Sequence, residues 1–269
     1  MSINAMPSGQ YPIERRAGEV ERLRLQNDAW ASDTAVMLDS IGVSPGWKCL
    51  DLACGPGGIT DVLAHKAGAW NVKGLDADPD FLDIARDWGP KGVTYLLGDA
   101  YDTELPEESF DLVHMRFLAS TAGDPDRLIA EAMRLLKPGG TLAMQEASFE
   151  TLRCYPPHPA WHGLLGIFSA CFPGHTGEPV AQQLYRKLRK AGFGDVNYRP
   201  RIVGTRAGDP WQDYLPATVE SLRSAILERG LTDEARLDRL LAECRAHLSD
   251  PDTVFASITC VQVWGTKEG

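Results

Sequence analysis

Between about residues 47 and 148, short apolar runs alternate with stretches in which apolar residues recur every three or four positions. The short runs are largely continuous in apolarity, which is typical of strands covered on both faces. We predict strands at KCLDLA, VKGLDA, VTYLLG, FDLVHM and TLAMQEA, and helices at GGITDVLAHKAG, DPDFLDIARDWG and DPDRLIAEAMRLLKPGG. The last two helices begin with Asp-Pro, a favourable helix start. This alternation predicts a parallel, doubly wound α/β sheet.

Further elements flank this region on both sides. Two more strands are predicted near DVNYRPRIVGT and TVFASITCVQVWG, and residues 11–41 predict two amphipathic helical stretches. We therefore expect a seven-stranded, mostly parallel Rossmann-like sheet with N-terminal helices and a helical lid inserted before the last strand. As one integrated domain, it would comprise an N-terminal segment (1–46), a core (47–206 and 253–269) and an inserted helical cap (207–252). Ligands of such sheets bind beyond the carboxyl ends of the strands, where the added helices can form a lid.

Composition narrows the class of protein. Hydrophobic residues make up 43% of the chain and charged residues 24%, as in ordinary globular proteins. The net charge of −10, with only one short basic run on a predicted helix, disfavours a nucleic-acid partner. No apolar stretch approaches the ~20 residues of a membrane-spanning helix, and no secretion signal opens the chain. The six cysteines show no metal-binding spacing. We expect a cytoplasmic protein with no metal and no membrane partner, and a homodimer would be compatible with the sequence.

The most informative motif is the glycine-rich segment DLACGPGG, which ends the first predicted strand. Gly55 and Gly57 have no Cβ atom, so the backbone there can turn tightly and approach a ligand closely. The next two strands end in Asp76 and in Asp99, at the same edge of the sheet. A carboxylate at the first position can accept hydrogen bonds from both ribose hydroxyls, and the second suits an adenine amino group. A nicotinamide cofactor is disfavoured, because Thr60 stands where the dinucleotide fingerprint has its third glycine.

The ordered set DLACGPGG, GLDADPD, GDA, FDLVHMRF and LLKPGGTL resembles the class I, Rossmann-like family of S-adenosylmethionine-dependent methyltransferases over about residues 47–148. The resemblance implies S-adenosylmethionine as cofactor and S-adenosylhomocysteine as product. It implies that Asp51 and the glycine turn lie at the methionine end of the cofactor, with Asp76 on the ribose and Asp99 on the adenine. The full set of implied cofactor contacts in the core is Asp51, Ala53, Gly55, Gly57, Asp76, Ala77, Asp99, Ala100, His114 and Arg116. The family usually has glycine where Ala53 stands, and we expect a tight fit there without loss of binding.

The N-terminal segment adds two expected contacts. Tyr11 followed by Glu19-x-x-Arg22-Leu23-x-x-Gln26 resembles the opening of a subgroup of small-molecule methyltransferases, including ones in natural-product pathways. In that subgroup the N-terminal helices close over the cofactor, which implies Tyr11 and Gln26 as cofactor contacts. The alternative is a surface amphipathic helix that packs its leucines on the core.

The side of the site that binds the methyl acceptor is less defined. A general base matters for a hydroxyl acceptor and little for a neutral amine or a thiolate. Candidate bases are His114, Glu146, His158, His162 and His175, and Arg116 could bind an acidic group of cofactor or substrate. The density of aromatic and histidine residues over 154–175 suits an apolar pocket with a few polar groups. The alternative places the aromatic residues in a lid core and the histidines on the surface.

These observations favour methyl transfer to a small molecule, and we expect a setting in specialised metabolism. A different class of function is open: a relative that binds S-adenosylmethionine but catalyses a cyclisation or rearrangement without methyl transfer. Fold alone does not separate the two, because the reaction is decided at the acceptor site. A protein or nucleic-acid acceptor is disfavoured by the acidic charge.

Overall fold

One eight-stranded sheet runs through residues 17–171 and 179–269, the part of the chain that the computed structural model describes. Six of the strands follow one another in the order β3-β2-β1-β4-β5-β8. β7 pairs with the edge of β8 that faces away from β5. Strands β1 to β5 pair in parallel, whereas β8 is antiparallel to all its neighbours. The strands are β1 (Cys49–Leu52), β2 (Val72–Asp76), β3 (Thr94–Leu97), β4 (Phe110–Arg116), β5 (Leu136–Ser148), β6 (Arg153–Tyr155), β7 (Phe193–Arg206) and β8 (Val254–Lys267).

The Rossmann-like fold is confirmed, but the expected strand number of seven is wrong by one. The additional strand is β6, which pairs with the first residues of β8 beside the end of β5. Three residues are too few for a hydrophobic pattern to reveal, and β6 forms only because β8 extends past the end of β5 and offers it a free edge.

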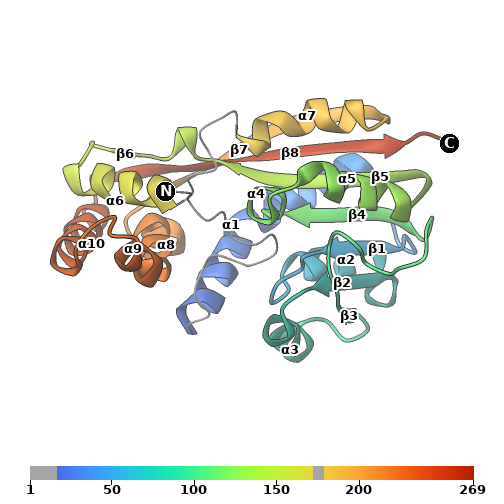
Figure 1. The fold of residues 1–269 in the computed structure, drawn as a ribbon, viewed down its shortest axis with the longest axis horizontal. Helices are drawn as coiled ribbons and strands as arrows, with labels where there is room; N and C mark the ends of the chain where they lie inside the picture. Colours follow the sequence, from blue (N-terminus) through green and yellow to red (C-terminus); the bar gives the residue numbers. More distant parts are fainter. Residues whose placement is uncertain (1–16, 172–178) are drawn as a thin grey trace.

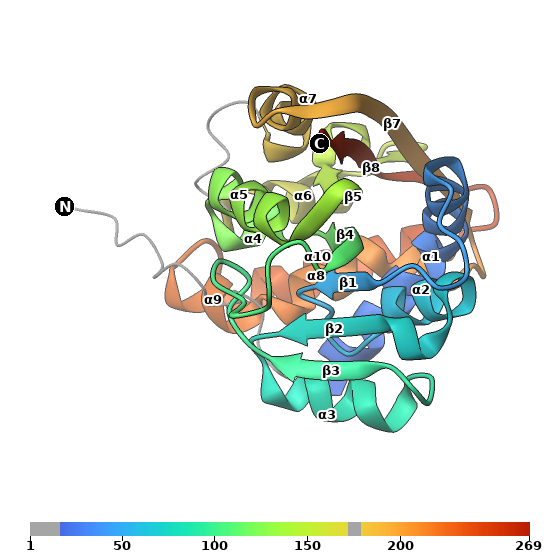
Figure 2. The same ribbon diagram turned by 90° about the vertical axis from the view of Figure 1, so that its right-hand side faces the viewer.

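Helices cover both faces of the sheet (Figure 2). One face packs against α1 and α2, and the other packs against α5 and α7. The helices around the sheet are α1 (Ala17–Ile41), α2 (Ile59–Ala67), α3 (Pro79–Trp88), α4 (Ala119–Ala122), α5 (Pro125–Leu135) and α7 (Val180–Lys190). The two Asp-Pro sequences begin helices as predicted, because Asp78 and Asp124 each accept a hydrogen bond from a backbone N–H of the first turn.

The N-terminal region differs from the prediction of two helical stretches. A single helix, α1, spans Ala17–Ile41, since no proline or glycine interrupts that segment after Gly18 and Gly42 follows its end with φ of +87°. Residues 11–16, the start of the predicted stretch, lie outside the described residues.

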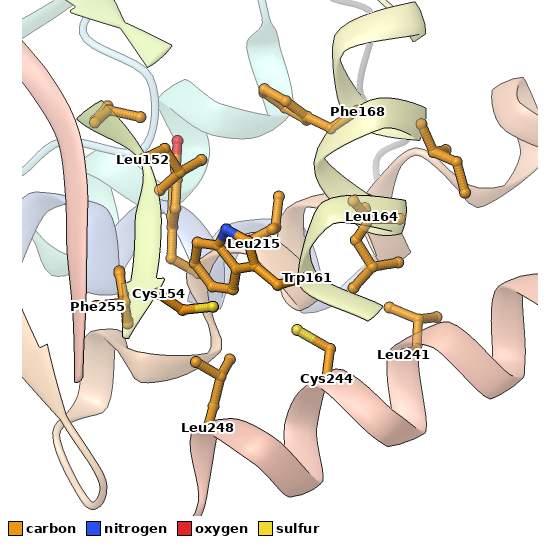
Figure 3. Close-up of a cluster of buried hydrophobic side chains, with 14 of the residues drawn as sticks. Leu152, Cys154, Trp161, Leu164, Phe168, Leu215, Leu241, Cys244, Leu248 and Phe255 are labelled. Carbon is orange, nitrogen blue, oxygen red and sulfur yellow. The ribbon is translucent and has the colours of Figure 1, made fainter. Parts of the chain in front are cut away.

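Beyond the carboxyl ends of the parallel strands lies a helical cap with its own apolar core (Figure 1). Its helices are α6 (Pro159–Cys171), α8 (Tyr214–Ser221), α9 (Arg223–Glu228) and α10 (Glu234–Leu248), with short 3₁₀ turns at Phe149–Thr151 and Pro210–Asp213. Trp161 of α6 lies at the centre, among leucines and cysteines of α8, α10 and β6 (Figure 3). The cap therefore draws on α6 as well as on the insertion before β8. Trp30 of α1 packs into the same core, which joins the N-terminal helix to the cap.

Within the described ranges, no helix is both long and apolar enough to cross a membrane. The expectations about nucleic acid, cytoplasmic location and oligomeric state stay predictions.

Candidate cofactor and active site

A cavity of ≈ 460 Å³ opens at the carboxyl ends of β1, β2 and β4 and is closed on one side by α1. The loop after β1 and the segment after β3 supply further walls. Of the residues predicted from sequence, those that line it are Gln26, Asp51, Ala53, Gly55, Gly57, Asp76, Ala77, Asp99, Ala100 and Arg116. The structure thus brings together residues spread over ninety positions of the chain, as the parallel topology requires. Tyr11 lies outside the described residues, and His114 does not line the cavity.

The turn after β1 is built from left-handed backbone conformations. Gly55, Gly57 and Gly58 have φ of +54°, +97° and +99°. A Cβ atom on Gly58 would lie 2.5 Å from the amide group of Asn27 and would displace it, and the φ of +99° also favours glycine there. Ala53 also has a positive φ, +60°, which costs an L-amino acid about 1–2 kcal/mol. Alanine therefore lines the cavity wall with backbone strain, and the expectation that it does not weaken binding stays a prediction.

Asp76, at the end of β2, holds this turn in place. One carboxylate oxygen accepts the N–H of Gly55 at 2.7 Å, and the other accepts the N–H of Asp78 at 2.9 Å. Burial raises the pKa of Asp76 above its ordinary value, while these two hydrogen bonds oppose the shift. Asp99 is exposed at the end of the next strand, where its Oδ1 accepts the N–H of Tyr101 at 2.8 Å. The two carboxylates thus stand at neighbouring strand ends.

His114 acts on the cavity through Asp51. The two residues are register partners on β4 and β1, and Nδ1 of the buried imidazole lies 3.0 Å from Oδ1 of Asp51. The other ring nitrogen lies 3.0 Å from Oε1 of Gln145 on β5. Oδ2 of Asp51 is buried and has no hydrogen-bond partner among the described residues. His114 therefore stands behind the carboxylate that lines the cavity, and its predicted direct contact with the cofactor stays a prediction.

Arg116 ends β4 at the cavity wall. Its Nη2 donates to Oδ1 of Asn27 at 3.3 Å, whereas Nη1 is buried without a partner among the described residues. Burial lowers the pKa of the guanidinium from its ordinary value. Phe117 follows with a left-handed φ of +55°, and its ring lies 5.6 Å from the guanidinium carbon. A bulky residue rarely adopts this conformation, and such strain is typical of functional sites.

S-adenosylmethionine fits these residues. Its amino-acid end carries an ammonium and a carboxylate, and the cavity offers one buried acceptor, Asp51 Oδ2, and one buried donor, Arg116 Nη1, that lack partners within the described chain. Unpaired buried polar groups are costly, so a zwitterion that pairs both would be bound favourably. Asp76 and Asp99 line the same cavity, and their contacts with ribose and adenine stay predictions.

Glu146, one of the predicted bases, contacts the start of α4, and its part in catalysis stays a prediction. Its fully buried carboxylate accepts the N–H of Ala119 at 2.6 Å and the hydroxyl of Ser120 at 2.7 Å. These groups begin α4, so Glu146 caps that helix, and it does not line the cavity. Burial raises the pKa of Glu146 from 4.5 to about 7.

The remaining candidate bases lie in the cap or outside the residues that the structure describes. His158 accepts the N–H of Ala160 at 3.2 Å, and its ring stacks on His247 with ring centroids 4.5 Å apart. His162 is exposed beside a second cavity of ≈ 310 Å³, which is separate from the first. His175 lies outside the described residues. His158 and His162 therefore do not line the cofactor cavity, and the part of all three histidines in catalysis stays a prediction.

Two contributors were missed by sequence reasoning. Asn27 contacts both Arg116 and the glycine turn, and Phe117 lines the cavity while packing against the cap core. The helical spacing from Leu23 through Gln26 and Asn27 to Trp30 could have indicated that a polar patch interrupts the buried stripe of α1. No sequence signal predicts the left-handed backbone of Phe117.

Fold and site together define a nucleoside-binding α/β protein, and comparisons with known proteins specify the family. A methyltransferase-domain family matches residues 50–144. An uncharacterized methyltransferase of Synechocystis is 41% identical over 159 residues, which cover 58% of this chain and 71% of the relative. A demethylmenaquinone methyltransferase of Staphylococcus aureus is 30% identical over 200 residues, which cover 68% and 81%. The chain belongs to the S-adenosylmethionine-dependent methyltransferases.

Other matches differ in length or in sequence. The chain spans about half of a 37.1 kDa transposon protein of Streptomyces fradiae, covering 48% of it at 30% identity. Phosphoethanolamine N-methyltransferase 2 of Haemonchus contortus, solved with phosphomonomethylethanolamine and S-adenosylhomocysteine, has a TM-score of 0.56 at 19% identity, covering 89% of this chain and 53% of that one. The (4+2)-cyclase SpnF has a TM-score of 0.55 at 17% identity, covering 93% and 95%. At this identity the structures show a shared fold.

Replacing Ala53 by glycine should stabilise the protein by about 1 kcal/mol, because glycine adopts the left-handed conformation without strain. Urea unfolding measures the change in the free energy of unfolding. The matched control is Ala242→Gly at an exposed position of α10, where the same substitution should destabilise by about 1 kcal/mol. A loss of stability at both positions would contradict the strain at Ala53.

Glu146→Gln should change how stability depends on pH. Burial raises the pKa of the Glu146 carboxyl, so the folded protein favours its protonated form. The contribution of this side chain to the free energy of unfolding is therefore full below pH 4.5 and is lost as the pH rises towards about 7. Across that window, the glutamine variant should gain about 3 kcal/mol relative to the wild type. Denaturant unfolding at several pH values measures this difference. The exposed Glu150→Gln serves as control, and a flat difference for Glu146→Gln would show that the buried carboxyl is not protonated near neutrality.

Proposed function

We propose that this methyltransferase transfers a methyl group from S-adenosylmethionine to an apolar small molecule of specialised metabolism. The observation that carries the placement of the cofactor is the pair of buried, unpaired groups on Asp51 and Arg116, which match the two charges of an amino acid. In this proposal Asp51 holds the ammonium and Arg116 the carboxylate, while Asp76 and Asp99 bind the ribose and the adenine.

The acceptor would bind between the cofactor cavity and the cap. Phe117 supports this placement, because it lines the cavity and also packs against the cap core. That core is rich in leucine and aromatic side chains, as suits an apolar ligand. Relatives named demethylmenaquinone methyltransferases are consistent with a small-molecule acceptor, and the N-terminal resemblance to natural-product enzymes favours specialised metabolism.

Catalysis would rest mainly on positioning. When bound, the cofactor supplies an already activated methyl group, so the chain must align the acceptor and exclude water, and alignment can contribute ~7–11 kcal/mol. No histidine or glutamate lines the described part of the cavity. Burial raises the pKa of both Cys54 and Tyr101 in its wall, so both side chains stay neutral. A carbon acceptor, or one that ionises without help, therefore suits the site better than an alcohol.

Deletion of the gene should cause a metabolite to accumulate that is lighter by one methylene than the product of the wild type. Mass spectrometry of extracts from both strains measures this, and the purified protein should then convert that metabolite while forming S-adenosylhomocysteine. The alternative is a cyclisation, the kind of reaction for which SpnF, a protein of the same fold, is named. It predicts a different result. In that case substrate and product would be isomers of equal mass, and no S-adenosylhomocysteine would form.

Arg116→Gln should weaken the binding of S-adenosylhomocysteine about tenfold or more, because a hydrogen bond between charged groups contributes ~1.5–3 kcal/mol. Binding of 5′-methylthioadenosine, which lacks the amino-acid end, should change little. Calorimetric titration of both ligands measures the two affinities. Arg236→Gln, at an exposed position in the first turn of α10, is the control. If both ligands lost affinity equally, Arg116 would support the fold of the cavity instead of the carboxylate.

A further inference from the structure

Helix α1 docks on the sheet through a band of polar contacts, which we call the polar seam. On α1 it comprises Asn27, Asp33 and Thr34, and on the sheet it comprises Arg116, Gln145 and Gln262. The Thr34 hydroxyl donates to Oε1 of Gln145 at 3.0 Å, and Nε2 of Gln262 donates to the carbonyl of Asp33 at 3.2 Å. Arg116 and Gln262 are both register partners of Gln145, so the seam crosses three adjacent strands.

A polar seam is an unusual way to bury a helix. Above and below it, Trp30, Met37 and Leu38 of the same helix are fully buried in apolar surroundings. Buried polar groups in this part of the helix cost free energy unless each is hydrogen-bonded. A methyl group in place of the Thr34 hydroxyl would avoid that cost. The seam therefore contributes specificity of placement more than stability.

The seam continues into the cofactor cavity. From Thr34, hydrogen bonds lead through Gln145 and His114 to Asp51, and each of the three contacts is 3.0 Å long. All four side chains are buried, with exposed fractions of 0 to 3%. At the far end, Oδ2 of Asp51 has no partner within the described residues. The chain thus begins on α1 and ends at an atom that lacks its hydrogen bond.

We propose that Thr34 and His114 are positioning residues: through Gln145 they fix the Asp51 carboxylate for the ammonium of S-adenosylmethionine, and so couple the docking of α1 to binding of the amino-acid end of the cofactor. This rests on the proposed placement of the cofactor in the first cavity. Leu23 and Gln26 of α1 line that cavity, so docking of the helix also completes its wall. Because such coupling is reciprocal, a bound ammonium stabilises the docked helix as much as the docked helix stabilises binding.

Thr34→Val tests the coupling, because valine keeps the shape of threonine but cannot donate to Gln145. We expect affinity for S-adenosylhomocysteine to fall about fivefold, the effect of one hydrogen bond, while affinity for 5′-methylthioadenosine stays unchanged. Thr34→Ser should restore most of the loss. Ser40→Ala is the matched control on the same helix, since the exposed Ser40 hydroxyl bonds only within α1. Calorimetric titration measures all four proteins.

Hydrogen exchange of α1 supplies the second measurement. In the wild type, S-adenosylhomocysteine should protect the amides of residues 20–41 more than 5′-methylthioadenosine does, and Thr34→Val should remove the difference. Equal weakening of both ligands, or no weakening of either, would overturn the coupling. Wild-type binding of S-adenosylhomocysteine and methyl transfer would stand in those cases, so failure of the coupling is distinguishable from failure of the proposed function.

Discussion

The hydrogen bond between His114 and Asp51 is the contact on which the rest of the site depends. It joins neighbouring strands at the centre of the sheet, where both side chains are shielded from water. A carboxylate in such surroundings is expensive to bury unless it is paired. The imidazole of His114 hydrogen-bonds to one oxygen of Asp51 and leaves the other oxygen for a ligand. His114 thus both stabilises the buried carboxylate and keeps it available for binding. Replacing His114 would therefore alter both.

The architecture separates two tasks between the hydrophobic clusters on the sheet and the core of the cap. The two clusters on the faces of the sheet fix the strand ends, and with them the positions of Asp51, Asp76 and Arg116. The core of the cap is built from a different set of helices, and Trp30 of α1 connects it to the rest of the molecule. Under the proposed placement of the acceptor at the cap, a constant cofactor site is combined with a separately built acceptor site, as expected of a fold that serves many reactions.

Glu146 shows why residue type and position do not suffice to assign a catalytic role. It lies near the end of β5, on the side of the sheet where an acceptor is expected to bind, which made it a reasonable candidate base. Its two oxygens instead accept hydrogen bonds from the start of α4, whose residues Thr121 and Ala122 line the cavity. The carboxylate shapes the wall, and its distance from the cavity follows from the direction of its side chain, which the sequence does not specify.

The sequence alone determined the alternation of strands and helices, the glycine turn and the acids at strand ends, because these depend on local patterns and on the parallel order of the sheet. Even the placement of Asp76 beside the turn follows from that order. Only the tertiary structure decided that His114 is buried behind Asp51, that α1 docks through Thr34 and Asn27, and that β6 adds a strand. These features depend on side-chain directions and on contacts between segments up to 229 residues apart, as between Asp33 of α1 and Gln262 of β8, and no local pattern encodes them.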